Sequence, residues 1–475
     1  MAFAFTPASC SSSRLDSAWL AAELSKLHMQ QYYSMTLRAA STGNSEDYVQ
    51  TDSIKVPVAS TLVAVDAICT AITSDPQVTI YDENLATAAT MLDADIDLAA
   101  DTRVEGTLAS GADVTRAAGD VISLRSKNDV GDDATNVQVT LTFQCNMTDK
   151  SGNDLETMAT RWSHHSTHNP PSAWLQSTLD NIDAAMDSPL SYVVLRGGHS
   201  DMDPGTGNTD TSYDNVVAPA NGTVTAIYAV ANAVTNDLEV NVKDGSANDL
   251  CSSNMKFATA NTFLTGTLNT DYTGVSAGDV LTIYAKAPGD DEEAQNVSVF
   301  VVMTTNAVTS AGAALTAYAA ATLGSGENIE DVWTDEETDL GTALNDATNI
   351  VVMEMGKESV GAGVANTTIQ DECVVPKACT ITGVYFVANA KAGGANPTAD
   401  LFDEELSTAA TMLDAAKTIA AADTAYSGTL ASGADTARDA GDVLSLRVTT
   451  NVGDGSLTNI RAFVVGIANI LNSTD

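Results

Sequence analysis

Alternation of apolar and polar residues predicts β-strands along most of this chain. The runs NVQVTLTF (Asn136–Phe143) and NVSVFVVM (Asn296–Met303) alternate over much of their length, as a strand with one buried face does. Val, Thr, Ile and Phe dominate these runs, and such residues favour a pleated sheet. Gly-Asp pairs and acidic clusters between the runs supply turns. We therefore expect a mainly β protein with antiparallel strands.

An internal repeat organises these strands. The segment GTLASGADVTRAAGDVISLR (Gly106–Arg125) returns as GTLASGADTARDAGDVLSLR (Gly428–Arg447). A weaker copy, GTLNTDYTGVSAGDVLTIY, lies halfway between them at Gly266–Tyr284. The period is thus about 160 residues, and the pattern predicts three copies of one unit.

Each copy holds seven or eight short strands in the same order. An apolar opening run is followed by a Pro-marked strand, an acidic turn, the AGD element and a last strand. Strands at spacings of about 8–12 residues indicate an antiparallel β-sandwich. A count of eight favours a jelly-roll order over an immunoglobulin-like one. The predicted fold is three tandem, jelly-roll-like β-sandwiches.

A short helical segment with one Trp is predicted before each sandwich, around Trp19, Trp174 and Trp333. Ser172 is a plausible N-cap, and apolar residues after it recur at helical spacing. The predicted organisation is an N-terminal arm and helix at 1–31, sandwiches at 32–146, 190–306 and 349–475, a helical linker at 147–189, and an Ala-rich or helical linker at 307–348.

Charge excludes several classes of partner. The 475 residues include 21 Lys and Arg against 62 Asp and Glu, a formal net charge of −41. Nucleic acids and anionic membranes are bound mainly by Lys and Arg, so we expect neither as a partner. The N-terminal stretch has no basic region followed by an apolar core, and no run reaches the roughly 18 apolar residues of a membrane span. The six cysteines form no CxxC pair and are expected to be reduced.

No motif for nucleophilic, phosphate-binding or zinc-peptidase chemistry occurs in the sequence. Acidic runs such as Asp132–Asp133 fall at predicted turn tips, where water surrounds them, so we interpret them as solvated turns. The cluster His164, His165 and His168 could present imidazoles to a metal, but it lacks a fourth ligand nearby. A surface loop or subunit contact is the alternative interpretation. We expect no catalytic residues and no enzyme activity.

A calcium loop is the most specific metal candidate. The stretch DMDPGTGNTDTSYD offers several oxygen ligands within a short loop, as a hard cation requires. Its spacing departs from the EF-hand pattern, and a polar surface loop is the alternative. The predicted ligands are Asp201, Asp203, Asn208, Asp210 and Asp214.

The repeated GTLxSG…AGDVLSLR element, followed by its strand–turn–strand ending, resembles the β-sandwich modules of tailed-bacteriophage virion structural proteins of the head decoration, fibre and spike types. The resemblance covers about two thirds of the chain. It implies synthesis in the host cytoplasm, assembly on the outer surface of a virion and no processing. It implies the major capsid protein or other virion proteins as partners, and a homo-oligomer.

We therefore expect a non-enzymatic capsid decoration or cement protein that bridges neighbouring capsid subunits. The main alternative is a fibre- or spike-type protein that binds a host receptor or glycan, assisted by calcium. A glycoside hydrolase or lyase would need two opposed carboxylates in a groove. An extracellular filament protein would need an export signal.

Overall fold

The computed structural model describes residues 30–42, 48–85, 89–109, 114–127, 132–146, 190–205, 209–289, 292–306, 308–309, 347–393, 396–404, 410–432, 434, 436–450 and 456–469. These residues form antiparallel β-sheets, as predicted, and contain no helix. No helix in this part of the chain could therefore cross a membrane. The predicted helical segments around Trp19, Trp174 and Trp333 and the histidine cluster lie outside it.

Residues 30–146 form two sheets. The first has the order β1 (Gln30–Ser41), β11 (Asp133–Asn146), β3 (Ser60–Ile68) and β8 (Val104–Gly106), with β4 (Ala71–Thr73) and β9 (Thr115–Arg116) attached to it. The second has the order β2 (Val49–Lys55), β10 (Val121–Ser126), β5 (Gln77–Asp82) and β6 (Ala89–Thr90), with β7 (Ile96–Asp97) attached. The first strand thus lies beside the last, and the second beside the last but one, which is the strand order of a jelly roll.

The same order recurs twice further along the chain. Residues 190–306 form the sheets β12 (Leu190–Met202), β21 (Glu293–Asn306), β14 (Gly222–Val230), β18 (Leu264–Thr265) and β13 (Thr211–Val217), β20 (Val280–Lys286), β16 (Glu239–Lys243), β17 (Met255–Lys256). Residues 347–469 form β23 (Ala347–Val360), β32 (Ser456–Asn469), β25 (Cys379–Ala392), β29 (Tyr426–Gly428) and β24 (Ile369–Val374), β31 (Val443–Thr449), β26 (Thr398–Asp403), β27 (Ala410–Thr411). The short strands β15 (Ala233–Thr235), β19 (Gly274–Val275), β22 (Val308–Thr309), β28 (Lys417–Thr418) and β30 (Ala437–Arg438) attach at the edges.

Each pair of sheets packs around its own apolar core, and we call the three pairs the N-terminal, middle and C-terminal modules. The alternation seen in the sequence places one face of every long strand in a core. Leu37 of β1, Ile80 of β5 and Leu141 of β11, for example, are all fully buried in one cluster that both sheets of the N-terminal module line. The five described cysteines are buried.

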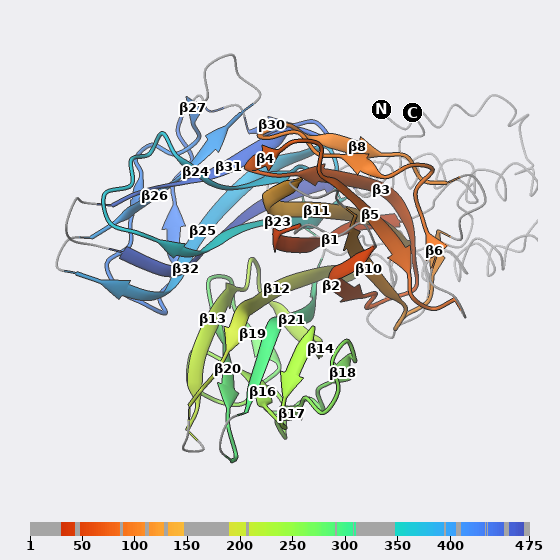
Figure 1. Cartoon of the computed structure of the whole chain (residues 1–475). Helices are drawn as coiled ribbons and strands as arrows, with labels where there is room; N and C mark the ends of the chain where they lie inside the picture. Colours follow the sequence, from red (N-terminus) through yellow and green to blue (C-terminus); the bar gives the residue numbers. More distant parts are fainter. Residues whose placement is uncertain are drawn as a thin grey trace, which may run out of the picture.

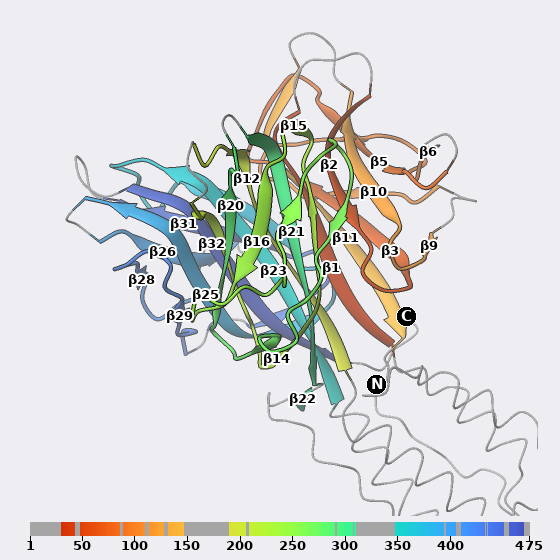
Figure 2. The ribbon, with the colours of Figure 1, turned by 90° about the horizontal axis from the view of Figure 1, so that it is seen from below.

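The three modules surround a common axis. Their first strands, β1, β12 and β23, run alongside one another in the same direction at the centre of the molecule (Figures 1 and 2). The contacts fix this direction, because the Arg196 guanidinium donates to the carbonyl of Thr36, while the backbone N–H of Tyr192, four residues earlier, donates to the side-chain oxygen of Gln31. All three first strands therefore begin at one pole of the molecule and end at the other.

Buried ion pairs distinguish the first and third copies of the repeat from the middle copy. Arg116 pairs with Asp82 at 2.6 Å, and Arg438 pairs with Asp403 at 2.8 Å, with both arginines almost fully buried. The middle module has Val275 at the position of these arginines, in the strand β19. The arginine and the aspartate that the first and third copies share thus lie in the interior of these two modules.

Replacement of Asp82 by Ala should lower the stability of the folded chain by about 3–5 kcal/mol, because Arg116 would keep its buried charge without that partner. Chemical denaturation monitored by circular dichroism measures the change in the free energy of unfolding. Asp237→Ala, which removes an exposed pair with Lys256, is the control and should have little effect. Equal losses of stability in the two variants would contradict the conclusion that the buried pair of Asp82 and Arg116 matters more than an exposed one.

Candidate functional site

The second strand of every module carries an aspartate at the same place. A β-bulge falls directly before Asp52 in β2, Asp214 in β13 and Asp371 in β24. A bulge re-aims the neighbouring side chain out of the regular alternation of a strand. Each carboxylate then accepts a hydrogen bond from a backbone N–H in the first strand of its own module. The donors are Arg38, Gly198 and Gly356, at 2.6, 2.7 and 2.6 Å.

The same three aspartates form ion pairs across the boundaries between modules. The pairs are Asp52 with Arg196 at 2.6 Å, Asp214 with Arg461 at 2.7 Å, and Asp371 with Arg38 at 3.4 Å. Each module thus gives one aspartate to the next and receives one in return. We call this closed set of six residues the axial ring. We call the three boundaries the first seam (N-terminal to middle), the second seam (middle to C-terminal) and the closing seam (C-terminal to N-terminal).

A fourth carboxylate lies inside the axial ring. Glu354 of β23 accepts the backbone N–H of Arg196 with both carboxylate oxygens, at 2.9 and 3.2 Å. Its carbonyl oxygen accepts bonds from Arg38 and from Gln138 of β11. Burial raises the pKa of Glu354 to about 7, although the three arginines of the ring oppose the rise. The ring therefore holds three arginines against four carboxyl groups, and one of these gains a proton near neutral pH.

Desolvation also acts on the aspartates. Burial raises the pKa of Asp52 and of Asp371 above the ordinary value, and their arginine partners oppose this. A buried carboxylate is costly unless it is paired and hydrogen-bonded, and both requirements are met here by geometry. The axial ring thus depends on all three modules being in place at once.

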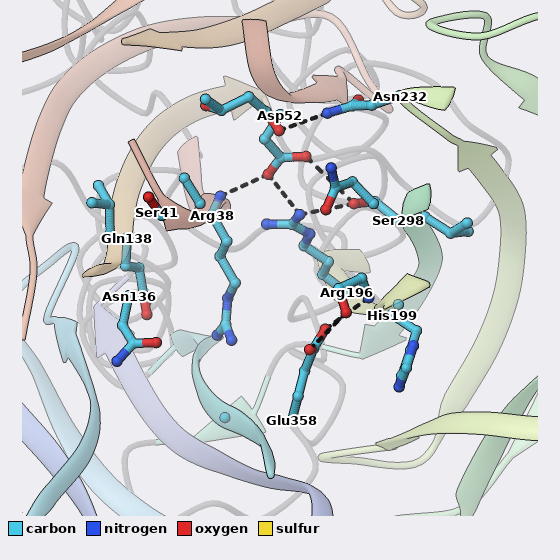
Figure 3. A pocket seen from close by; sticks show the side chains of 18 of the residues that line it. Arg38, Ser41, Asp52, Asn136, Gln138, Arg196, His199, Asn232, Ser298 and Glu358 are labelled. Carbon is cyan, nitrogen blue, oxygen red and sulfur yellow. Dashed lines mark hydrogen bonds and ion pairs between the residues drawn. The ribbon is translucent and has the colours of Figure 1, made fainter. Parts of the chain in front are cut away.

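A cavity of about 680 Å³ opens at the pole where the first strands end. Residues of all three modules line it, and the ring residues Arg38, Asp52 and Arg196 form part of its wall (Figure 3). Other lining groups are amides, hydroxyls, carboxylates and the apolar side chains of several valines. Two contacts close the rim between modules: Lys357 to Asn136 and Ser200 to Glu358. Four basic residues of a chain with only 21 lie here, so this is a comparatively cationic place on an acidic protein. The remaining polar lining includes Ser41, Gln138, His199, Asn232 and Ser298.

The structure separates the residues of the predicted calcium loop. Asp214 is fully buried and belongs to the axial ring, so it is not a ligand of a surface loop. Asp210 pairs with Lys243 at 2.5 Å. Among the described residues no group of three or more acidic, His or Cys side chains is placed to hold a metal ion. Asn208 lies outside the described residues, while Asp201 and Asp203 are exposed near the end of β12.

The sequence held a signal for the ring aspartates. Each of them stands five residues before the proline that marks the second strand, as in Asp52 and Pro57, Asp214 and Pro219, Asp371 and Pro376. This shared spacing places the aspartate at one register position in all three copies. The arginines carry no such signal, because they come from different positions of the module.

Comparison with known proteins identifies no family. No family model matches the chain, and no curated protein matches it either. Among solved structures, a triple jelly-roll fold from the turret assembly of an archaeal virus is similar over 91% of both chains, with 10% identity and a TM-score of 0.13. A protein of Parabacteroides distasonis described as secreted aligns over 57% of this chain and 88% of its own, with 10% identity and a TM-score of 0.14. TM-scores this low carry no argument about function.

Replacement of Glu354 by Gln should remove a pH dependence of stability. The folded chain holds the Glu354 proton more tightly than the unfolded chain, since its pKa rises from 4.5 to about 7. Stability of the native protein is therefore lost as the pH rises from about 4.5 to 7, by at most about 3 kcal/mol. Denaturation of both forms at several pH values measures this. Glu358→Gln, an exposed neighbour in β23, is the control, and parallel profiles for wild type and Glu354→Gln would contradict the assignment.

Proposed function

We propose that this chain is a non-enzymatic structural protein of a virus particle, built as three jelly-roll domains in tandem. In this proposal it acts as a decoration or cement protein that bridges neighbouring subunits on the outer surface of a capsid. One observation carries the proposal: the axial ring locks three modules of the same strand order into a single unit with approximate threefold arrangement. Jelly rolls are common building blocks of viral capsids.

The polarity of the unit supports an attachment role. The first and last strands of each module pair at the pole where the first strands begin, as in Gln30 with Asn146, Leu190 with Asn306 and Thr348 with Asn469. The described residues that border the segments 1–29, 147–189 and 310–346 lie at this pole. We assign these segments to contacts with the particle. Several linked contacts give firm attachment even where each is weak, because the first raises the effective concentration of the others.

The charge of the chain agrees with an outer position. A net charge of −41 keeps a protein soluble at high copy number and gives no attraction to packaged nucleic acid. A bridging protein also needs a rigid body, so that contacts on two sides are held at a fixed distance. Buried ion pairs between the modules meet that need.

A second candidate function is the binding of a host receptor or glycan, and the cavity favours it. The cavity lies at the pole opposite the one where each module begins and ends along the chain, and its lining includes amides, hydroxyls and guanidinium groups beside carboxylates and valines. Such groups orient polar, hydroxyl-rich guests. In this case the unit would be the tip of a fibre or spike, with calcium as an assisting ion.

Particle association tests the first function. Virus particles purified on a density gradient should contain this chain in fixed stoichiometry with the major capsid protein, as measured by quantitative mass spectrometry. Mild removal of the chain should lower the temperature at which the capsid releases its genome. Recovery of the chain only in the soluble fraction would count against a structural role.

Glycan binding tests the second function. A glycan array with and without calcium should give saturable binding, and Ser359→Trp should abolish it by filling the cavity. Ser246→Trp, in an exposed turn after β16, is the matched control and should bind as the native chain does. Absence of any ligand, or equal binding by both variants, would leave the cavity without this role.

A further inference from the structure

The three seams follow one plan, so equivalent positions can be compared directly. At the second and closing seams, the residue after the ring aspartate lies near a loop of the next module. One residue of that loop has a left-handed backbone and donates its amide to the end of the third long strand in every module. These loop residues are Asn261 at the first seam, Asp423 at the second and Asp101 at the closing seam, with φ of 56°, 51° and 49° and donor distances of 2.7, 2.8 and 2.8 Å. Asn215 lies opposite Asp423 and Glu372 opposite Asp101, and Ser53 holds the equivalent position after Asp52.

The second seam shows what this position does. Asn215 is fully buried, and its side-chain amide donates a hydrogen bond to the carboxylate of Asp423 at 2.7 Å. A second contact joins Ser212 to Asn389 next to it. The pair consists of one donor and one acceptor, and it joins the middle module to the C-terminal module.

The closing seam has a carboxyl group in place of the donor. Glu372 is only 2% exposed, and neither of its carboxylate oxygens has a hydrogen-bond partner among the described residues. Across the seam stands Asp101, at the position of Asp423. An ionised glutamate has no proton to donate. A hydrogen bond like that of Asn215 therefore requires Glu372 to carry a proton.

The surroundings of Glu372 favour the protonated form. Three carboxylates act on it: Asp101 of the N-terminal module, Glu404 at the end of β26 and Asp371 beside it. The nearby cation Arg447 of β31 is already paired with Glu404 at 2.7 Å. The thiols of Cys69 and Cys373 are close by, and they are neutral. Burial first, and then these carboxylates, raise the pKa of Glu372 to about 8.

The closing seam is also held by less apolar surface than the others. The core cluster of the N-terminal module extends into the middle module through Val194 and Val230, and that of the middle module extends into the C-terminal module through Ile350 and Val387. At the closing seam, Ile68, Val374 and Val443 form a small separate cluster. No linker joins the two modules here directly, because they are the first and the last of the chain.

We propose that the closing seam is a proton-operated clasp, in which Glu372 takes the donor role of Asn215 while it holds its proton. Loss of that proton to solvent leaves two facing carboxylates and opens the ring between the N-terminal and C-terminal modules. The chain then remains connected through its other two seams. This clasp is a property of the ring itself and holds whichever proposed function is correct.

Glu372→Gln tests the clasp, because glutamine is a permanent donor. Hydrogen–deuterium exchange of the full chain, read by mass spectrometry at pH 6 and pH 9, compares wild type and variant at the same pH. We expect equal protection of residues 99–102 and 369–374 at pH 6. At pH 9 the wild type should exchange at least tenfold faster than the variant in these two segments only. Equal exchange at pH 9, or weaker protection of the variant at pH 6, would overturn the proposal.

The converse substitution gives an independent check. Asn215→Asp places a carboxylate opposite Asp423, so the second seam should acquire the alkaline opening that the closing seam has in wild type. Protection of residues 211–217 should then fall between pH 6 and pH 9 relative to wild type. No change in this segment would contradict the proposed mechanism. Restoration of wild-type protection at pH 9 by calcium alone would show that a cation closes the seam, and would overturn the proton-operated form.

Discussion

The ion pairs between the three ring aspartates and the arginines of the neighbouring modules are the interactions on which this structure depends. Each aspartate accepts a hydrogen bond from a backbone amide of its own module and forms an ion pair with an arginine of another module. Buried ion pairs are weak evidence for net stability, because desolvation offsets their attraction. Their strength lies in specificity. A module in the wrong orientation would leave a charge buried and unpaired.

Alternation of apolar residues and the 160-residue repeat predicted the β class, the three copies and a jelly-roll-like order, and the described strands agree with the class and the order. The axial ring was not predicted. Arg38 and Arg196 lie two register positions apart in equivalent strands, while Arg461 stands on a last strand. A sequence repeat reveals only residues that occupy equivalent positions in each copy. These arginines occupy equivalent places in the ring but different positions in the three copies. Asp214 was therefore assigned to a calcium loop when its partner was 247 residues away.

The repeat is conserved inside the modules and has diverged at their boundaries. Arg116 and Arg438 keep their buried partners in two modules, whereas Ser53, Asn215 and Glu372 occupy one position at three seams. A homotrimer of identical chains would have three identical seams. Because one gene encodes all three modules, each seam here has its own chemistry. This freedom explains how equivalent positions in a ring of like modules can hold a hydroxyl, an amide and a carboxyl group.

In every module the first strand begins and the last strand ends at the same pole, and this has a consequence for how the chain can be rearranged. The order of the modules along the polypeptide is not imposed by the ring, because the described residues that flank both linkers lie on the same side of it. A circular permutant that begins with the middle or the C-terminal module would meet the same neighbours in the same orientation. In such permutants a different seam would lack a linker between its two modules. The absence of that linker, and not the position in the ring, would then decide which pair of modules is free to separate.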